Sequence, residues 1–217
     1  DCNTGDIIQL NNLNEGLVYN STTGIWNEGV KAIKKDKDDN LFVLGESSLG
    51  LYKFSPNGSL LWNKVFTTSN HLFLEDLEID SLGNVYCLIE NPNGFSFNIT
   101  GSGLPSTTEK VIVCKISSTG SVEYITGIPG PLHDYHYIAL DNMLNLYIST
   151  LIDQNNYKYP TIYKIDQNGN HSFFHTLLSS STVTAYGYKY HDIQFINGNL
   201  FVSFCSPGVG NGSCYVD

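Results

Sequence analysis

The chain has 217 residues, a mass of 24.0 kDa and a formal net charge of −10, from 21 acidic and 11 basic residues. Every basic residue is a lysine. The negative net charge argues against binding to nucleic acid, and the absence of arginine argues against arginine-mediated recognition of phosphate. The longest apolar runs, of about six residues, are far shorter than the ~20 that membrane insertion requires.

Along the chain, four segments share an apolar residue, a turn, and an asparagine that begins an alternating strand. The asparagines are Asn40, Asn84, Asn145 and Asn199, and Asp36, Asp80 and Asp141 stand four residues before the first three. Aspartate, glycine and asparagine close hairpins through positive φ angles and local hydrogen bonds. Each segment therefore predicts a β-hairpin.

A second hairpin pattern follows three of these segments. Its mark is a lysine five residues before a glycine, in the pairs Lys53–Gly58, Lys115–Gly120 and Lys164–Gly169. A looser copy without the lysine, Ile7-Ile-Gln9-Leu-Asn-Asn-Leu-Asn-Glu-Gly16-Leu-Val-Tyr19, precedes the first full unit. Two hairpins in succession predict a four-stranded antiparallel meander in each unit.

The repeat indicates an all-β fold, because no segment has the periodicity of an amphipathic helix. One small sheet cannot bury both of its faces, whereas sheets arranged radially can, so we expect a β-propeller. The expected units are a half-blade at 6–28, blades at 29–68, 74–128 and 134–178, and a partial blade at 188–217. About four blades follow if the terminal halves pair; otherwise the chain is an arc of a larger propeller. A β-sandwich is the alternative.

The pattern strand-D-x-x-G-N-x-Y, then K-[IF]-[SD]-x-x-G, resembles the SBBP-type and NHL-like β-propeller repeats of secreted and cell-surface proteins. The resemblance covers 30 to 204 and the half-unit at 7 to 19. It implies a propeller fold and leaves the chemistry open, since such repeats serve adhesion, scaffolding and sometimes catalysis. Long, unequal spacers within the units distinguish this chain from the family pattern.

Loop lengths predict one plain and one elaborated end of the propeller. The spacers expected at 91–109, 153–160 and 206–212, and the blade-to-blade connections, all fall at the same end, where binding residues usually lie. Tyrosines gather there and suit the stacking of sugars or the anchoring of a protein. The predicted ligand-binding residues are Tyr135, Tyr137, Tyr157, Tyr159, Tyr186, Tyr188, Tyr190, Asp134 and Asp192.

Three further polar residues occupy matching positions before the first strand of a unit. They are Glu75, His136 and, with a one-residue deletion, His191. The first strands should line the central channel, so these side chains are the acid–base set if the protein is an enzyme. Capping of loop backbone is the alternative role, and neither a metal nor another cofactor is predicted.

Cysteines and glycosylation sequences favour an extracellular or cell-surface location. Five cysteines allow a disulfide between Cys205 and Cys214 or between Cys2 and Cys214, while Cys87 and Cys114 are expected as buried thiols in strands. The possible glycosylation sites are Asn20, Asn57, Asn98, Asn170 and Asn211. The start without methionine suggests a processed chain or a piece of a longer one.

The predicted function is a non-catalytic module for binding, adhesion or extracellular assembly, which meets a protein or carbohydrate at the long-loop end. The first alternative is a propeller lyase or hydrolase that acts on a glycan or lactone-like ligand at the channel mouth. The second is a subunit of an extracellular filament or shell, which would make the chain a homo-oligomer.

Overall fold

The computed structural model describes residues 30–45, 50–68, 72–105, 107–130, 132–154, 157–176 and 189–205, all in strands, turns or irregular segments. The strands are β1 Val30–Lys35, β2 Leu41–Gly45, β3 Gly50–Phe54, β4 Leu60–Thr68, β5 Phe73–Ile79, β6 Val85–Glu90, β7 Phe97–Ile99, β8 Val111–Ile116, β9 Val122–Ile128, β10 Leu132–Leu140, β11 Leu146–Gln154, β12 Tyr157–Ile165, β13 His171–Thr176, β14 Lys189–Ile196 and β15 Asn199–Cys205. Among these residues, none belongs to a helix with the length and hydrophobicity needed to cross a membrane.

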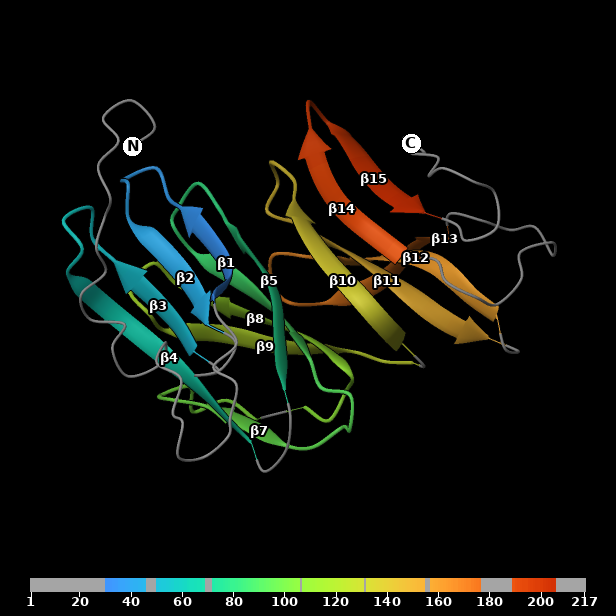
Figure 1. Cartoon of the computed structure of the whole chain (residues 1–217), viewed down its shortest axis with the longest axis horizontal. Coiled ribbons are helices and arrows are strands. Elements are labelled where there is room, and N and C mark those ends of the chain that lie inside the picture. Colours follow the sequence, from blue (N-terminus) through green and yellow to red (C-terminus); the bar gives the residue numbers. More distant parts are fainter. Residues whose placement is uncertain are drawn as a thin grey trace.

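The strands form antiparallel sheets in the order of the repeat. β1–β4, β5-β6-β8-β9 and β10–β13 are three meanders, and β14 pairs with β15. The first strands lie side by side, because β1 contacts β5, β5 contacts β10 and β10 contacts β14 (Figure 1). The expected half-blade at 6–28 lies outside the described residues.

Three hydrophobic clusters fill the spaces between neighbouring sheets. In β6, Cys87 and Ile89 pack toward the first sheet, while Tyr86 and Leu88 pack toward the third. A further cluster joins the third sheet to β14 and β15. A sheet that buries its two faces against two different sheets is a propeller blade, so the structure confirms the propeller and not the sandwich.

The turn between the first two strands of each meander explains the spacing of aspartate and asparagine. Asp36 Oδ1 accepts hydrogen bonds from the backbone N–H of Asp38 and Asn40 at 3.0 and 2.9 Å, and Asn40 Nδ2 donates to Asp36 Oδ2 at 2.9 Å. Asp80 and Asp141 repeat this arrangement in the other two meanders, and Asp166 repeats it in the turn between β12 and β13. The repeated residues therefore have a structural role in satisfying backbone donors.

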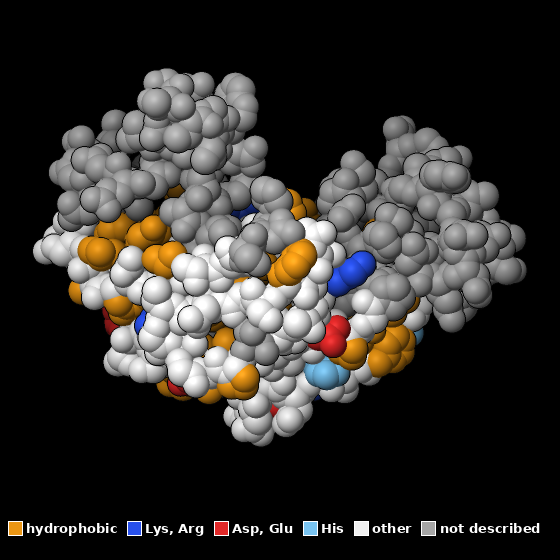
Figure 2. Space-filling model, turned by 90° about the horizontal axis from the view of Figure 1, so that it is seen from below, with side chains coloured by type: hydrophobic (Ala, Val, Ile, Leu, Met, Phe, Trp, Pro, Cys, Tyr) orange, Lys and Arg blue, Asp and Glu red, His pale blue; other side chains and the backbone are white. Residues whose placement is uncertain are grey.

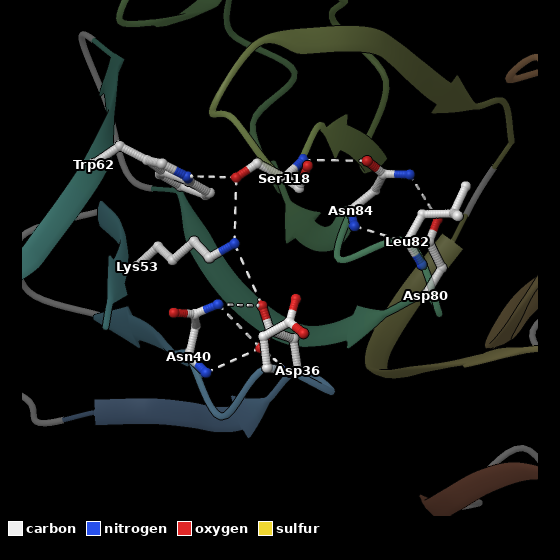
Figure 3. Close-up of polar contacts among 9 residues, drawn as sticks. Asp36, Asn40, Lys53, Trp62, Asp80, Leu82, Asn84 and Ser118 are labelled. Carbon is white, nitrogen blue, oxygen red and sulfur yellow. Dashed lines mark hydrogen bonds and ion pairs between the residues drawn. The ribbon is translucent and has the colours of Figure 1, made fainter. Parts of the chain in front are cut away.

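The repeated lysines lie over the aromatic ring of the adjacent strand. Lys53, Lys115 and Lys164 approach the rings of Phe42, Tyr86 and Tyr147, with Nζ 4.8, 5.6 and 5.5 Å from the ring centroids. Tyr86 and Tyr147 donate their hydroxyls to the turn aspartates, Asp80 and Asp141. Phe42 has no hydroxyl, and Lys53 Nζ instead lies 3.3 Å from Asp36 Oδ2, as Figure 3 shows.

Two of the segments predicted as long loops contain strands in the structure. The segment predicted at 153–160 is mostly strand, since Asp153 pairs with Lys158 and Gln154 with Tyr157 in an extended β11–β12 hairpin. Part of the segment predicted at 91–109 is β7, which adds to the outer edge of the first sheet through Phe66–Ile99 and Thr68–Phe97 pairs. The unpaired edge of β4 provides the donors and acceptors that recruit this strand.

The predicted buried thiols are confirmed. Cys87 and Cys114 are directly opposite each other on β6 and β8, and both are free and buried. Cys2 and Cys214 lie outside the described residues, as does the side chain of Cys205, so their disulfides stay predictions. Figure 2 shows one face of the molecule, and among its described residues charged side chains are few, which agrees with the 15% charged composition.

Candidate functional site

All four first strands carry an irregularity of register near their beginning. It falls between Val30 and Ala32 in β1, between Leu74 and Asp76 in β5, and between Tyr190 and Asp192 in β14. In β10 it spans 134–136. The inserted residues include Lys31, Glu75, His136 and His191. Bulges redirect side chains and are frequent beside functional sites, so this ring of bulges is the first element of the candidate site.

Charged side chains from these strands act electrostatically on Tyr137 of β10. Lys31 Nζ lies 3.1 Å from Glu75 Oε2, which joins β1 to β5. Burial raises the pKa of the Tyr137 phenol, the charge of Lys31 lowers it, and the charges of Asp76, Glu75 and Asp192 raise it. The phenol is therefore within electrostatic reach of three other first strands. We name Lys31, Glu75, Asp76, Tyr137 and Asp192 the axial cluster.

Asp76 connects two blades within the axial cluster. Its Oδ1 accepts the N–H of Leu77 at 2.8 Å, and its Oδ2 accepts the N–H of Ile138 on β10 at 3.1 Å. Burial raises the pKa of Asp76 to about 6, although both N–H donors and the charge of Lys34 favour the ionised form. Asp192 has the matching position in β14, where it accepts the N–H of Ile193 at 2.9 Å.

The raised pKa of Asp76 predicts a specific dependence of stability on pH. The folded protein binds this proton more tightly than the unfolded chain, whose aspartate has a pKa of about 3.9, so the contribution of Asp76 to stability falls as pH rises from about 4 to 6. Relative to Asp76→Asn, the natural protein should lose about 2 kcal/mol across this interval, a figure that allows for partial solvent screening. Urea titrations between pH 3.5 and 7.5 measure the difference.

Asp192→Asn is the matched control for this prediction, because Asp192 makes the corresponding backbone contact but is exposed. Its stability difference from the natural protein should change less with pH than that of Asp76→Asn. Parallel pH profiles for the natural protein and Asp76→Asn would show that Asp76 titrates as an ordinary carboxylate.

The other predicted site residues fall into three groups. His136 is buried, at 2% exposure, in the irregular part of β10. The backbones of Asp134 and Tyr135 are in β10, those of Tyr157 and Tyr159 in β12, and those of Tyr190 and His191 in β14; their side chains are outside the described part. Tyr186 and Tyr188 lie outside the described residues altogether. Tyr157 and Tyr159 therefore belong to a strand and not to the loop in which the sequence placed them.

No set of three or more histidine, cysteine or acidic side chains in the described part of the chain is arranged to hold a metal ion. The axial cluster can instead accept hydrogen bonds through its carboxylates and donate one through the Tyr137 hydroxyl. Three of the possible glycosylation sites, Asn57, Asn98 and Asn170, are exposed, while Asn20 and Asn211 lie outside the described residues.

Sequence reasoning missed Lys31, although the sequence contained the signal. Lys31 stands five residues before Asp36, as Glu75 does before Asp80 and His136 before Asp141. The same count would have placed a lysine in the ring of polar residues and predicted its ion pair with Glu75.

Comparisons with solved structures find similar β-propeller proteins. A protein of unknown function from Bacteroides caccae matches with a TM-score of 0.50 and 13% identity, over 85% of this chain and 58% of that one. Virginiamycin B lyase from Staphylococcus aureus matches with a TM-score of 0.43 and 16% identity, over 86% and 69% of the two chains. A streptogramin B lyase gives a TM-score of 0.35 and 11% identity, over 82% and 77%.

These similarities concern the fold alone, because the identities are low, and this chain spans little more than half of the Bacteroides protein. No protein-family model matches the chain, and no curated protein does. The resemblance to SBBP-type and NHL-like repeats therefore stays a prediction.

Proposed function

We propose that this protein is a non-catalytic binding module that holds a hydroxyl-rich carbohydrate at the axial cluster. The observations that carry the proposal are the ion pair of Lys31 and Glu75 between β1 and β5, the hydrogen bond of Asp76 to the backbone of Ile138 between β5 and β10, and the contact of β14 with β10. Each strand contributes through a bulge, so the cluster depends on the whole array of blades and not on one loop.

The chemistry of the axial cluster supports a neutral, hydroxylated ligand. Glu75 offers a carboxylate to hydroxyl donors and Tyr137 offers a hydroxyl. The two oxygens of Asp192 already accept hydrogen bonds from the N–H of Ile193 and from Nε2 of Gln194, so Asp192 contributes chiefly its negative charge. The positive charge of Lys31 is engaged by Glu75 at 3.1 Å. Together with a net charge of −10, this favours uncharged sugars over anionic ones.

We further propose that the protein acts outside the cell or at its surface. Exposed asparagines in sequons, a surface poor in charged side chains and the many asparagine, serine and threonine residues support this location. A glycan ligand would then belong to a neighbouring cell or to an extracellular polymer.

Titration of the protein with neutral oligosaccharides of glucose, mannose and N-acetylglucosamine tests the proposal by NMR. We expect amide shifts to change around Lys31, Asp76, Tyr137 and Asp192 with at least one of these sugars. Tyr137→Phe should weaken binding about tenfold, which corresponds to one hydrogen bond of about 1.4 kcal/mol. Tyr52→Phe is the control, because Tyr52 is a partly exposed tyrosine of β3 and not a member of the axial cluster.

Shift changes confined to the tight-turn end, or none with any of these sugars, would contradict the assignment of the ligand to this site. The enzyme alternative has its own support in the bulges at Glu75, His136 and His191 and in the pKa of Asp76 near 6. Mass spectrometry of the recovered sugar separates the two functions. Recovery of the intact sugar supports a binding module. Recovery of cleavage products with the natural protein, but not with the His136→Ala variant, supports an enzyme.

A further inference from the structure

Asparagine followed by glycine is the sequence in which asparagine deamidates most readily, and the chain contains it five times. Glycine has no side chain to shield its backbone nitrogen, so this nitrogen can attack the side-chain carbonyl carbon of the asparagine before it. The asparagines of the five pairs are Asn57, Asn93, Asn168, Asn197 and Asn211. Asn211 lies outside the described residues. The other four are all exposed, so exposure of the asparagine alone does not rank them.

Three of the four described pairs hold the glycine nitrogen in a turn. In each, the glycine N–H donates a hydrogen bond to the carbonyl three residues earlier, and this bond must break before the nitrogen can attack. The bonds run from Gly58 to Ser55 at 2.9 Å, from Gly94 to Asn91 at 3.0 Å and from Gly169 to Asp166 at 3.0 Å. These three glycines are also half-buried.

Gly198 belongs to a different kind of turn. Asn197 and Gly198 alone connect β14 to β15 (Figure 1), and their φ angles of +50° and +84° are both positive, as in a type I′ turn. Ile196 and Asn199 face each other at its ends. A turn of this type is closed by the N–H of its fourth residue, so the N–H of Gly198, the third residue, takes no part in the closure. Gly198 is exposed, unlike the other three glycines.

We propose that Asn197 is a site of spontaneous deamidation in the folded protein and reacts before the other described asparagine–glycine pairs. The nitrogen of Gly198 loses its proton to solvent and bonds to Cγ of Asn197. The bond from Cγ to Nδ2 breaks, and Nδ2 leaves as ammonia with a proton taken from water. Water then opens the cyclic imide at one of its two carbonyls, which gives aspartate or isoaspartate. The step needs only the chain and water.

The products change a hairpin that contributes to the core. Both add a negative charge, and isoaspartate also adds one carbon to the backbone of a two-residue turn, whose length fixes the register of β14 on β15. Ile193 and Val202 pair across this hairpin and belong to the cluster that joins it to the third sheet. The modification therefore acts on the packing of the hairpin as well as on the charge of the surface.

Peptide mapping by mass spectrometry tests the proposal in the whole natural protein. The protein is kept folded at mildly alkaline pH in water labelled with heavy oxygen and is then digested in ordinary water. Labelled oxygen in a peptide marks deamidation that took place before digestion, and chromatography separates aspartate from isoaspartate. We expect Asn197 to deamidate about fivefold to tenfold faster than Asn57, Asn93 and Asn168, a factor that corresponds to one turn-closing hydrogen bond.

The same incubation in urea is the matched control, because each pair keeps its sequence and loses its turn. The advantage of Asn197 should disappear there. A rate at Asn197 no higher than at the other three asparagines of the folded protein overturns the proposal. An advantage that persists in urea also overturns it, because the cause would be the neighbouring residues and not the turn. Neither measurement depends on carbohydrate binding, so both stand apart from the proposed function.

Discussion

Replacing Lys53 with methionine is expected to lower the free energy of unfolding by about 3 kcal/mol, the lower end of the range for breaking a buried ion pair. The side chains of Lys53 and Asp36 are 6% and 2% exposed, and their charged atoms lie 3.3 Å apart. Methionine keeps the apolar stem over Phe42 but leaves the Asp36 carboxylate without its cation. The hydrogen bonds from Asn40 remain, which places the cost at the lower end (Figure 3).

Lys53 also connects the first two blades, because Nζ donates to the carbonyl of Ser118 at 3.2 Å. Chemical denaturation of the natural protein and the variant measures the loss. Lys35→Met is the matched control, since Lys35 pairs with Asp39 on the exposed side of the same turn and its removal should have little effect. Equal stabilities for the two variants would mean that the buried pair does not stabilise the fold.

Gly120→Ala should be comparably destabilising, by about 3 kcal/mol. The φ angle of +90° costs a residue with a Cβ atom about 1–2 kcal/mol, and the added methyl would lie 3.1–3.3 Å from three ring atoms of Trp62. The indole, whose Nε1 donates to the carbonyl of Ser118 at 3.1 Å, must then move, which adds about 1–3 kcal/mol of overpacking. Thermal unfolding gives the change in Tm, and tryptophan fluorescence reports the displacement of the ring.

Gly198→Ala separates the two contributions to this loss. Gly198 has a φ angle of +84° in the β14–β15 turn, and an added Cβ meets no described atom within 4 Å. It should therefore show only the backbone cost. If Gly120→Ala is no worse than Gly198→Ala, the ring over Gly120 contributes no steric constraint.

The sequence was sufficient to predict the blades because their signals are local. The aspartate and asparagine of a turn lie only four residues apart, and the aspartate carboxylate accepts the backbone N–H of the asparagine, as Asp80 does from Asn84. A lysine such as Lys115 contacts the ring of Tyr86 on the adjacent strand. β7 could not be predicted in this way. Its three residues pair with a strand of another blade, so the reason for their conformation lies about 30 residues earlier in the chain.

The repeat in the sequence indicated which positions of the first strands belong to the candidate site, but not which side chains act together there. Matching positions singled out Glu75 and His136, and the structure shows that these positions are bulges in the first strands. The electrostatic effect on Tyr137 of carboxylates from two other strands depends on how the blades turn about their axis. No periodicity in the sequence records that angle.

The strand β7 has one more consequence. A fourth strand at the rim of a propeller blade normally displays free backbone groups, and such edges invite sheet extension between molecules and aggregation. Here Phe97–Ile99 occupies the rim of β4, and Thr100 extends the contact through Val65. The insertion in the second blade thus occupies the edge of β4 from Val65 to Thr68, and this part of the rim has no free backbone groups with which another molecule could extend the sheet.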